Sequence, residues 1–193
     1  MAADLSKRIA IIGGGFYGCA IAENLTAHGY ECTIYEKRHR ILAGTASKTL
    51  FRVHKGPHYP RSKETALQCL EGYNKFYNKF SECIDTSFNN YYFISSDQSK
   101  TTFDNFLDFC SAVNIKHEVI SKGDCQNIIN NCDGGIICRE GVINVFRMYD
   151  YYKKFFAENV CEVLTNKKII CINRNGNRIV LKTDVESYEA DIA

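Results

Sequence analysis

The feature that most constrains the fold is a glycine-rich turn that follows a short apolar run near the N-terminus. Ile9–Ile12 predicts a buried strand, residues 13–18 give the spacing GxGxxG, and residues 16–28 have the apolar spacing of a helix. Cys32–Tyr35 predicts a second strand, which ends at Glu36. A strand, a helix and a strand in under 30 residues open a parallel α/β sheet, in which a right-handed crossover places the two strands side by side.

The three glycines of this turn have separate tasks in a dinucleotide site. Gly13 permits the tight turn, Gly15 has no side chain to keep a pyrophosphate from the backbone, and Gly18 lets the helix lie close to the sheet. The free N–H groups and the dipole at the helix start then bind the diphosphate. Glu36, 18 residues after Gly18, is placed to accept hydrogen bonds from ribose hydroxyls. The alternative is a glycine-rich turn beside an incidental glutamate.

The fingerprint alone does not separate FAD from NAD. The basic residues 37–40 that follow Glu36 would fit the 2′-phosphate of NADP, but the Glu36 carboxylate would repel that phosphate. A solvated turn is the simpler interpretation of this basic run, and the choice of dinucleotide depends on the next segment.

The rest of the chain alternates between helical and extended patterns. Residues 37–61 contain glycine and proline and predict a long functional loop, because structureless segments of that length are uncommon in compact domains. An Asn-Gly turn within residues 173–177 predicts a hairpin. The further predicted helices are 63–80 with Ser62 as N-cap, 102–113 and 145–159, and the further strands are 91–95, 116–120, 136–139, 169–172, 179–182 and an extended segment from 187.

Composition excludes several classes of protein. The chain has 193 residues, a net charge of +2, and apolar runs far shorter than the ~20 residues of a membrane-spanning helix. We therefore expect neither nucleic acid nor a membrane segment as a partner. The ten cysteines include no CxxC pair, so we expect no metal site, and without a signal-peptide pattern we expect free thiols in the cytoplasm.

Residues 44–60 resemble the second conserved stretch of FAD-dependent oxidoreductases of the D-amino-acid-oxidase class. In the branch of L-2-hydroxyglutarate dehydrogenase and glycerol-3-phosphate dehydrogenase, a run of small and hydroxyl residues leads to His-x-Gly shortly before a Tyr. Here residues 45–49 are followed by His54, Gly56 and Tyr59. The usual asparagine near residue 48 is absent.

The resemblance implies that FAD is the cofactor and that its pyrophosphate and ribityl chain lie along residues 45–49. It implies that residues 52–56 run beside the isoalloxazine ring, which makes His54, Arg52 and His58 the candidate catalytic residues. Arg61 would pair with a substrate carboxylate or phosphate, or would be a surface charge. The residues expected to bind the cofactor are Gly13, Gly15, Phe16, Tyr17, Gly18, Glu36, Lys37, Thr45, Ser47 and Thr49.

The same resemblance implies a Rossmann-like FAD-binding domain with a parallel sheet and a β-meander, interrupted by part of an inserted α+β substrate domain. Residues 1–85 and 141–193 would belong to the FAD-binding domain and residues 86–140 to the substrate domain. Because the family's chains are about twice as long or more, we expect a truncated form whose first strand lacks a neighbour on one side. We also expect self-association or a second polypeptide to complete the fold.

The function implied is oxidation of a CH–OH or CH–NH₂ group of a small hydroxy or amino acid by hydride transfer to flavin. The partner would then be a small-molecule substrate. The alternatives are a non-catalytic nucleotide-binding remnant or accessory subunit, and an NAD(P)-dependent dehydrogenase.

Overall fold

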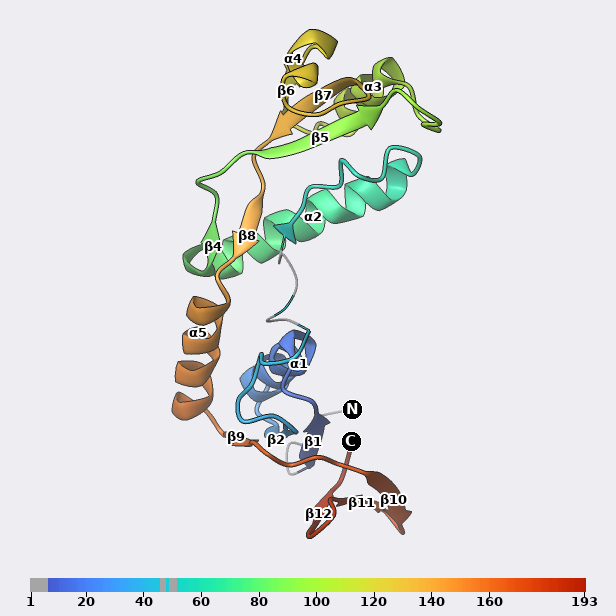
Figure 1. Cartoon of the computed structure of the whole chain (residues 1–193). Coiled ribbons are helices and arrows are strands. Elements are labelled where there is room, and N and C mark those ends of the chain that lie inside the picture. The colour runs from blue at the N-terminus through green and yellow to red at the C-terminus, as the bar shows by residue number, and fades with distance from the viewer. Residues whose placement is uncertain (1–6, 46–47, 49–51) are drawn as a thin grey trace. The chain divides into compact units, whose positions relative to one another are not determined.

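The computed structural model describes residues 7–45, 48 and 52–193, and the chain divides into two compact units (Figure 1). Residues 1–49 and 145–193 form the first unit, and residues 50–144 form the second. By their contacts, residues 50–85 group with the second unit, although we expected them in the FAD-binding domain. None of the helices in the described ranges is long and apolar enough to cross a membrane.

The first unit contains a parallel sheet and a β-meander. Its elements in chain order are β1 (Arg8–Ile12), α1 (Phe16–Ala27), β2 (Glu31–Tyr35), α5 (Val145–Glu158), β9 (Cys161–Leu164), β10 (Cys171–Asn175), β11 (Arg178–Lys182) and β12 (Ser187–Ala190).

The parallel sheet has the order β1-β2-β9, as the strand–helix–strand pattern predicts. Helices α1 and α5 contact each other, and each packs on the sheet. Ile11 faces α1, whereas Ala10 packs with Tyr35, Leu181 and Ala190 in a cluster shared with the meander. Because successive strand residues point to opposite faces, the helices cover one face of the sheet and the meander covers the other.

The meander confirms the hairpin expected at the Asn-Gly turn. β10 pairs antiparallel with β11 from Cys171↔Lys182 to Asn175↔Arg178, and β12 pairs with the other edge of β11. Beyond β12 the chain returns to the parallel sheet, where Ile192 forms a parallel bridge with Ile9. The expectation of a first strand without a second neighbour is therefore wrong at this bridge.

The second unit is built on short antiparallel sheets. Its elements are β3 (Arg52–Val53), α2 (Lys63–Phe80), the 3₁₀ helix η2 (Ser81–Cys83), β4 (Ile84–Asp85), β5 (Asn90–Ser95), α3 (Phe103–Ala112), β6 (Glu118–Ile120), α4 (Lys122–Gln126), β7 (Cys132–Cys138) and β8 (Gly141–Ile143).

Strand β7 lies between β5 and β6, and its inner face packs with α3 around Phe106 and Ile136. β7 begins four residues before the strand that the sequence predicts at 136–139, because Gly134 and Gly135 do not break it. A Cβ on Gly134 would lie 2.5 Å from the Phe103 ring, and one on Gly135 would lie 2.6 Å from the Phe93 ring. The two glycines let aromatic rings pack directly on the strand.

Strand β8 lies between β3 and β4 in a further small sheet that the sequence patterns did not predict. β3 and β4 are two residues long, which is too short for a period of alternation to be recognised. This sheet joins the start of the 52–62 segment to residues 141–143, so it fixes the position of the predicted catalytic residues within the second unit.

Candidate functional site

The glycine turn between β1 and α1 has the geometry of a diphosphate cradle. Gly13 has a φ of +103°, a backbone conformation that favours glycine, and its N–H donates to the Tyr35 carbonyl at 2.8 Å. Gly15 is the N-cap of α1, and no side chain of its own caps the helix. The first N–H groups of a twelve-residue helix therefore begin at the end of the parallel sheet, where the fingerprint predicts the ligand.

The glycines of the turn differ in what a side chain would meet. A Cβ on Gly18 would lie 1.9 Å from the Gly13 carbonyl oxygen, and one on Gly14 would lie 2.7 Å from the Ile41 side chain. A Cβ on Gly15 would meet nothing within 4 Å among the described residues. Gly14 and Gly18 are thus required by the packing, whereas the space at Gly15 is open and fits a diphosphate. The role of Gly14 was missed because it lies between the fingerprint positions.

The carboxylate of Glu36 is buried and holds this turn in place. Its Oε2 accepts the Gly14 N–H at 2.8 Å, and its Oε1 accepts the Arg38 N–H at 2.8 Å. A carboxylate oxygen has two lone pairs, so each oxygen keeps the capacity for a ribose hydroxyl. Binding of ribose by Glu36 stays a prediction, and its link to both backbone segments is a second role that the sequence did not reveal.

The other residues expected to bind the cofactor are arranged less uniformly. The ring of Phe16 packs edge-on against Tyr152 of α5, whereas Tyr17 is 82% exposed. Lys37 and Thr45 are exposed, and Ser47 and Thr49 lie outside the residues that the structure describes.

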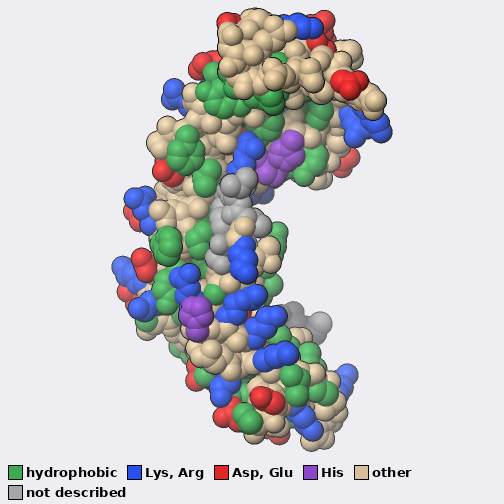
Figure 2. All heavy atoms as spheres, in the orientation of Figure 1, with side chains coloured by type: hydrophobic (Ala, Val, Ile, Leu, Met, Phe, Trp, Pro, Cys, Tyr) green, Lys and Arg blue, Asp and Glu red, His purple; other side chains and the backbone are tan. Residues whose placement is uncertain are grey.

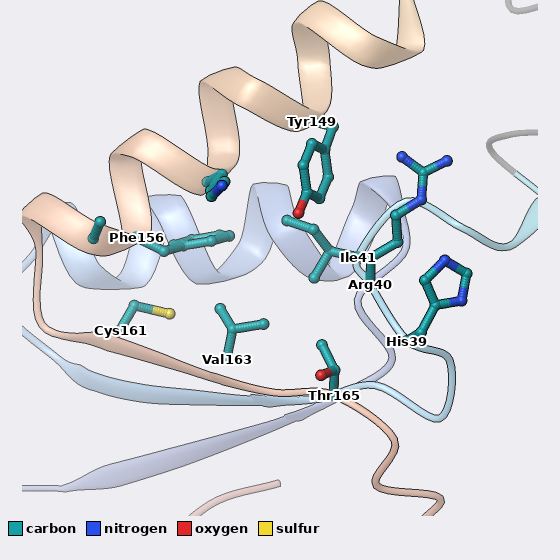
Figure 3. A pocket seen from close by; sticks show the side chains of 10 residues that line it. His39, Arg40, Ile41, Tyr149, Phe156, Cys161, Val163 and Thr165 are labelled. Atoms are coloured by element: carbon teal, nitrogen blue, oxygen red, sulfur yellow. The ribbon is translucent and has the colours of Figure 1, made fainter.

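A pocket of about 400 Å³ lies in the first unit between α5, β9 and residues 39–41 (Figure 3). Ile41, Phe156 and Val163 form its apolar floor, beside the Cys161 thiol, whose pKa burial raises to about 12. Arg40 lies over the Tyr149 ring, 5.4 Å from its centroid. Part of the basic run 37–40 therefore packs against α5 and is not simply a solvated turn.

In the second unit, Glu140 is the centre of a buried hydrogen-bond network. The Glu140 side chain is fully buried, and its Oε2 accepts from Arg52 Nη2 at 2.7 Å and from the Tyr92 hydroxyl at 2.6 Å. Its Oε1 accepts the Lys55 N–H at 2.7 Å. Burial and the hydrogen bond to Glu140 raise the pKa of Tyr92, which therefore stays protonated as a donor. Glu140 precedes a strand of three residues, and nothing in its sequence neighbourhood marked it.

The predicted catalytic residues come together beside this network. The rings of His54 and His58 lie 4.1 Å apart between centroids, and the Arg52 guanidinium lies 5.0 Å from the centre of the Tyr92 ring. Burial lowers the pKa of both histidines below the usual value, so both imidazoles are neutral at pH 7. The Nδ1 atom of His54 is buried and has no hydrogen-bond partner within the described part of the chain.

The contrast between Gly15 and Gly18 gives the first test. Gly15→Val should abolish FAD binding while lowering the free energy of unfolding by no more than about 1 kcal/mol, the scale of an N-cap change. Gly18→Ala should instead lower the free energy of unfolding by roughly 1–3 kcal/mol, because its Cβ overlaps a backbone oxygen. Chemical denaturation and flavin titration measure the two effects.

Gly72→Ala in α2 is the matched control, because a Cβ there meets nothing within 4 Å in the described structure. We expect it to raise the free energy of unfolding by about 0.5–1 kcal/mol, the usual gain from replacing a helical glycine. Retention of FAD affinity by Gly15→Val would contradict the fingerprint interpretation.

The second test removes the charge of Glu140. Glu140→Gln places an amide among three donors, so the free energy of unfolding should fall by roughly 1.5–3 kcal/mol, the range for hydrogen bonds to a charged group. Glu118→Gln, at an exposed position of β6, should stay within about 0.5 kcal/mol of the parent protein. Equal stability of both variants would show that the buried network contributes nothing.

Known proteins share both the sequence and the fold. Over 77 residues the chain is 39% identical to the FAD-dependent monooxygenase kojA of Aspergillus flavus, which covers 40% of this chain and 18% of that protein. Over 186 residues it is 24% identical to one subunit of the anaerobic glycerol-3-phosphate dehydrogenase of Haemophilus influenzae, which covers 92% of this chain and 32% of the relative. The chain therefore spans a third or less of the length of these curated relatives.

Two solved structures have the same fold at low sequence identity. Glycine oxidase from Geobacillus kaustophilus superposes with a TM-score of 0.73 at 15% identity, over 97% of this chain and 55% of that one. L-α-glycerophosphate oxidase from Mycoplasma pneumoniae, solved with FAD bound, gives a TM-score of 0.69 at 16% identity, over 93% and 50% of the two chains.

The match to a protein family extends over nearly the whole chain. Residues 8–192 fit the family described as FAD dependent oxidoreductase, abbreviated DAO. This range includes the glycine turn, Glu36 and the Glu140 network. Because the family match exceeds half of the chain and agrees with the open space at Gly15, the chain belongs to the DAO family of FAD-dependent oxidoreductases.

Proposed function

We propose that this chain binds FAD through its first unit and contributes to oxidation of a CH–OH or CH–NH₂ group in a small hydroxy or amino acid. The observation that carries the proposal is the open helix start at Gly15, next to a buried carboxylate that fixes both backbone segments around it. The family membership supports FAD as the dinucleotide. The glycerol-3-phosphate dehydrogenase and glycine oxidase that resemble the chain act, by their names, on a hydroxy and an amino compound.

In this proposal the first unit binds the cofactor and does not react. The N–H groups at the start of α1 face the diphosphate, and Glu36 accepts the ribose hydroxyls while it keeps its two backbone hydrogen bonds. When bound, FAD supplies the two-electron redox chemistry that protein side chains lack. The chain contributes a preorganised site, because the turn is closed before the ligand arrives.

The second unit supplies the groups that we assign to the substrate. A hydroxyl or ammonium group must lose a proton when the neighbouring C–H bond is broken, so a neutral base is required nearby. His54 is neutral at pH 7 and has an unpartnered buried Nδ1, which makes it our choice for that base. Arg52 and His58 lie in the same cluster and are assigned to orienting the substrate.

A flavin-dependent monooxygenase is the second candidate, because the 39% identity over 77 residues is to a protein of that name. The two reactions leave different products. Dehydrogenation removes two hydrogens from the substrate, whereas monooxygenation adds an oxygen atom. Turnover of hydroxy and amino acids under ¹⁸O₂, followed by mass spectrometry, should give product oxidised without direct insertion of ¹⁸O, and insertion would favour the monooxygenase.

The proposal is tested first by cofactor binding. FAD added to the purified chain should bind saturably and shift its absorption bands, and Glu36→Ala should weaken binding by roughly 1.5–3 kcal/mol. Glu31→Ala, at the opposite and exposed end of β2, is the control and should bind FAD as the parent protein does.

Because Glu36 also holds the turn, the unfolding free energy of each variant without FAD is measured beside the affinity. Unchanged FAD affinity in Glu36→Ala would show that the carboxylate does not contact the ribose. Saturable binding of NAD in place of FAD would contradict the proposed function.

A further inference from the structure

A second pocket, of about 450 Å³, lies entirely within the second unit. Residues 58–62, which lead into α2, form one side, and residues 99–101, which lead into α3, form the other, together with Ile94 of β5. This volume is within the range of sites that hold small molecules. The pocket adjoins the Glu140 network, because His58 lines it and stacks on Tyr92 at 6.2 Å between ring centroids.

The side chains that line the pocket are strongly biased towards hydrogen-bond donors and positive charge. Arg61 and Lys100 come from opposite sides of the pocket, and none of the described lining residues is acidic. The first acidic residues of the two adjoining helices, Glu64 and Asp104, are outside the lining. In the part of Figure 2 that corresponds to α2 and β5, histidine side chains are visible beside lysine or arginine side chains. The remaining polar lining residues are His58, Tyr59, Ser62, Ser99 and Thr101.

Some of these groups already have partners, and others do not. Ser62 Oγ accepts the Thr65 N–H as the N-cap of α2, and Ser99 Oγ donates to the Thr101 carbonyl at 2.7 Å. Arg61 and Lys100 form no ion pair with any residue that the structure describes. Two unpaired cations on facing segments produce a positive potential in the pocket, which a bound anion would neutralise.

We propose that Arg61 and Lys100 form a binding site for the phosphate group of a small organic molecule. A planar carboxylate is satisfied by one bidentate arginine, whereas a tetrahedral phosphate presents oxygens in several directions. Two cations from opposite sides, with the hydroxyls of Tyr59 and Thr101 between them, match the second geometry. Pro60 and Ile94 give the carbon part of the molecule an apolar wall.

The position of this site connects it to the proposed chemistry. A phosphate held by Arg61 and Lys100 would place the attached carbon chain beside His58, whose ring is 4.1 Å from that of His54. The substrate would then be a phosphorylated alcohol or amine. This assignment of the ligand as substrate rests on the proposed function, whereas phosphate binding by the pocket does not.

Titration of inorganic phosphate into the full chain at constant ionic strength, without flavin, tests the site directly. We expect saturable binding by calorimetry, which Arg61→Gln and Lys100→Gln should each weaken by roughly tenfold, the loss of one charged hydrogen bond. The double variant should abolish binding, and Arg61→Lys should retain part of it. Lys63→Gln, at the first residue of α2 but outside the pocket lining, is the matched control and should bind as the parent protein does.

A spectroscopic measurement separates local binding from general charge effects. Phosphate should shift the imidazole resonances of His58 in the parent protein and leave them unchanged in the double variant, while circular dichroism confirms that both are folded. Absence of saturable binding, an equal loss in Lys63→Gln, or acetate binding as tight as phosphate would overturn the proposal. FAD affinity is measured separately, so failure of the phosphate site and failure of the proposed function give different results.

Discussion

The buried carboxylate of Glu36 is the interaction on which the geometry of the first unit depends. It joins the Gly14 N–H in the turn after β1 to the Arg38 N–H in the loop after β2, and so fixes the ends of two adjacent strands. A buried carboxylate is costly unless its oxygens are hydrogen-bonded, and here both are. The space at Gly15 is therefore defined by the protein itself before any ligand is present.

Glu140 plays the corresponding part in the second unit. It is also fully buried, and it joins Arg52, Lys55 and Tyr92, which belong to segments far apart in the sequence. In each unit an acid at the end of a short strand organises a loop that carries candidate functional residues. The ordering of these loops is one reason why a few strands of two or three residues can support a defined site.

Sequence reasoning succeeded where the signal is local. The glycine spacing, the first two strands and the helix from Lys63 to Phe80 follow from periodicity and capping, and the structure confirms them. It failed where the determinant is a tertiary contact. The position of Gly14 against Ile41, the partners of Glu140 and the strand through Gly134 depend on residues distant in sequence, which neither spacing nor propensity reveals.

The central claim is that the start of α1 is the flavin site, and amide chemical shifts during an FAD titration test it most directly. The account predicts that the N–H resonances of Gly14, Gly15 and Phe16 shift saturably with FAD. The amides at the start of α2, another helix N-terminus with its own serine cap, should not shift in the same way. Unchanged resonances at residues 14–16 in the presence of bound FAD would place the cofactor elsewhere and contradict the account.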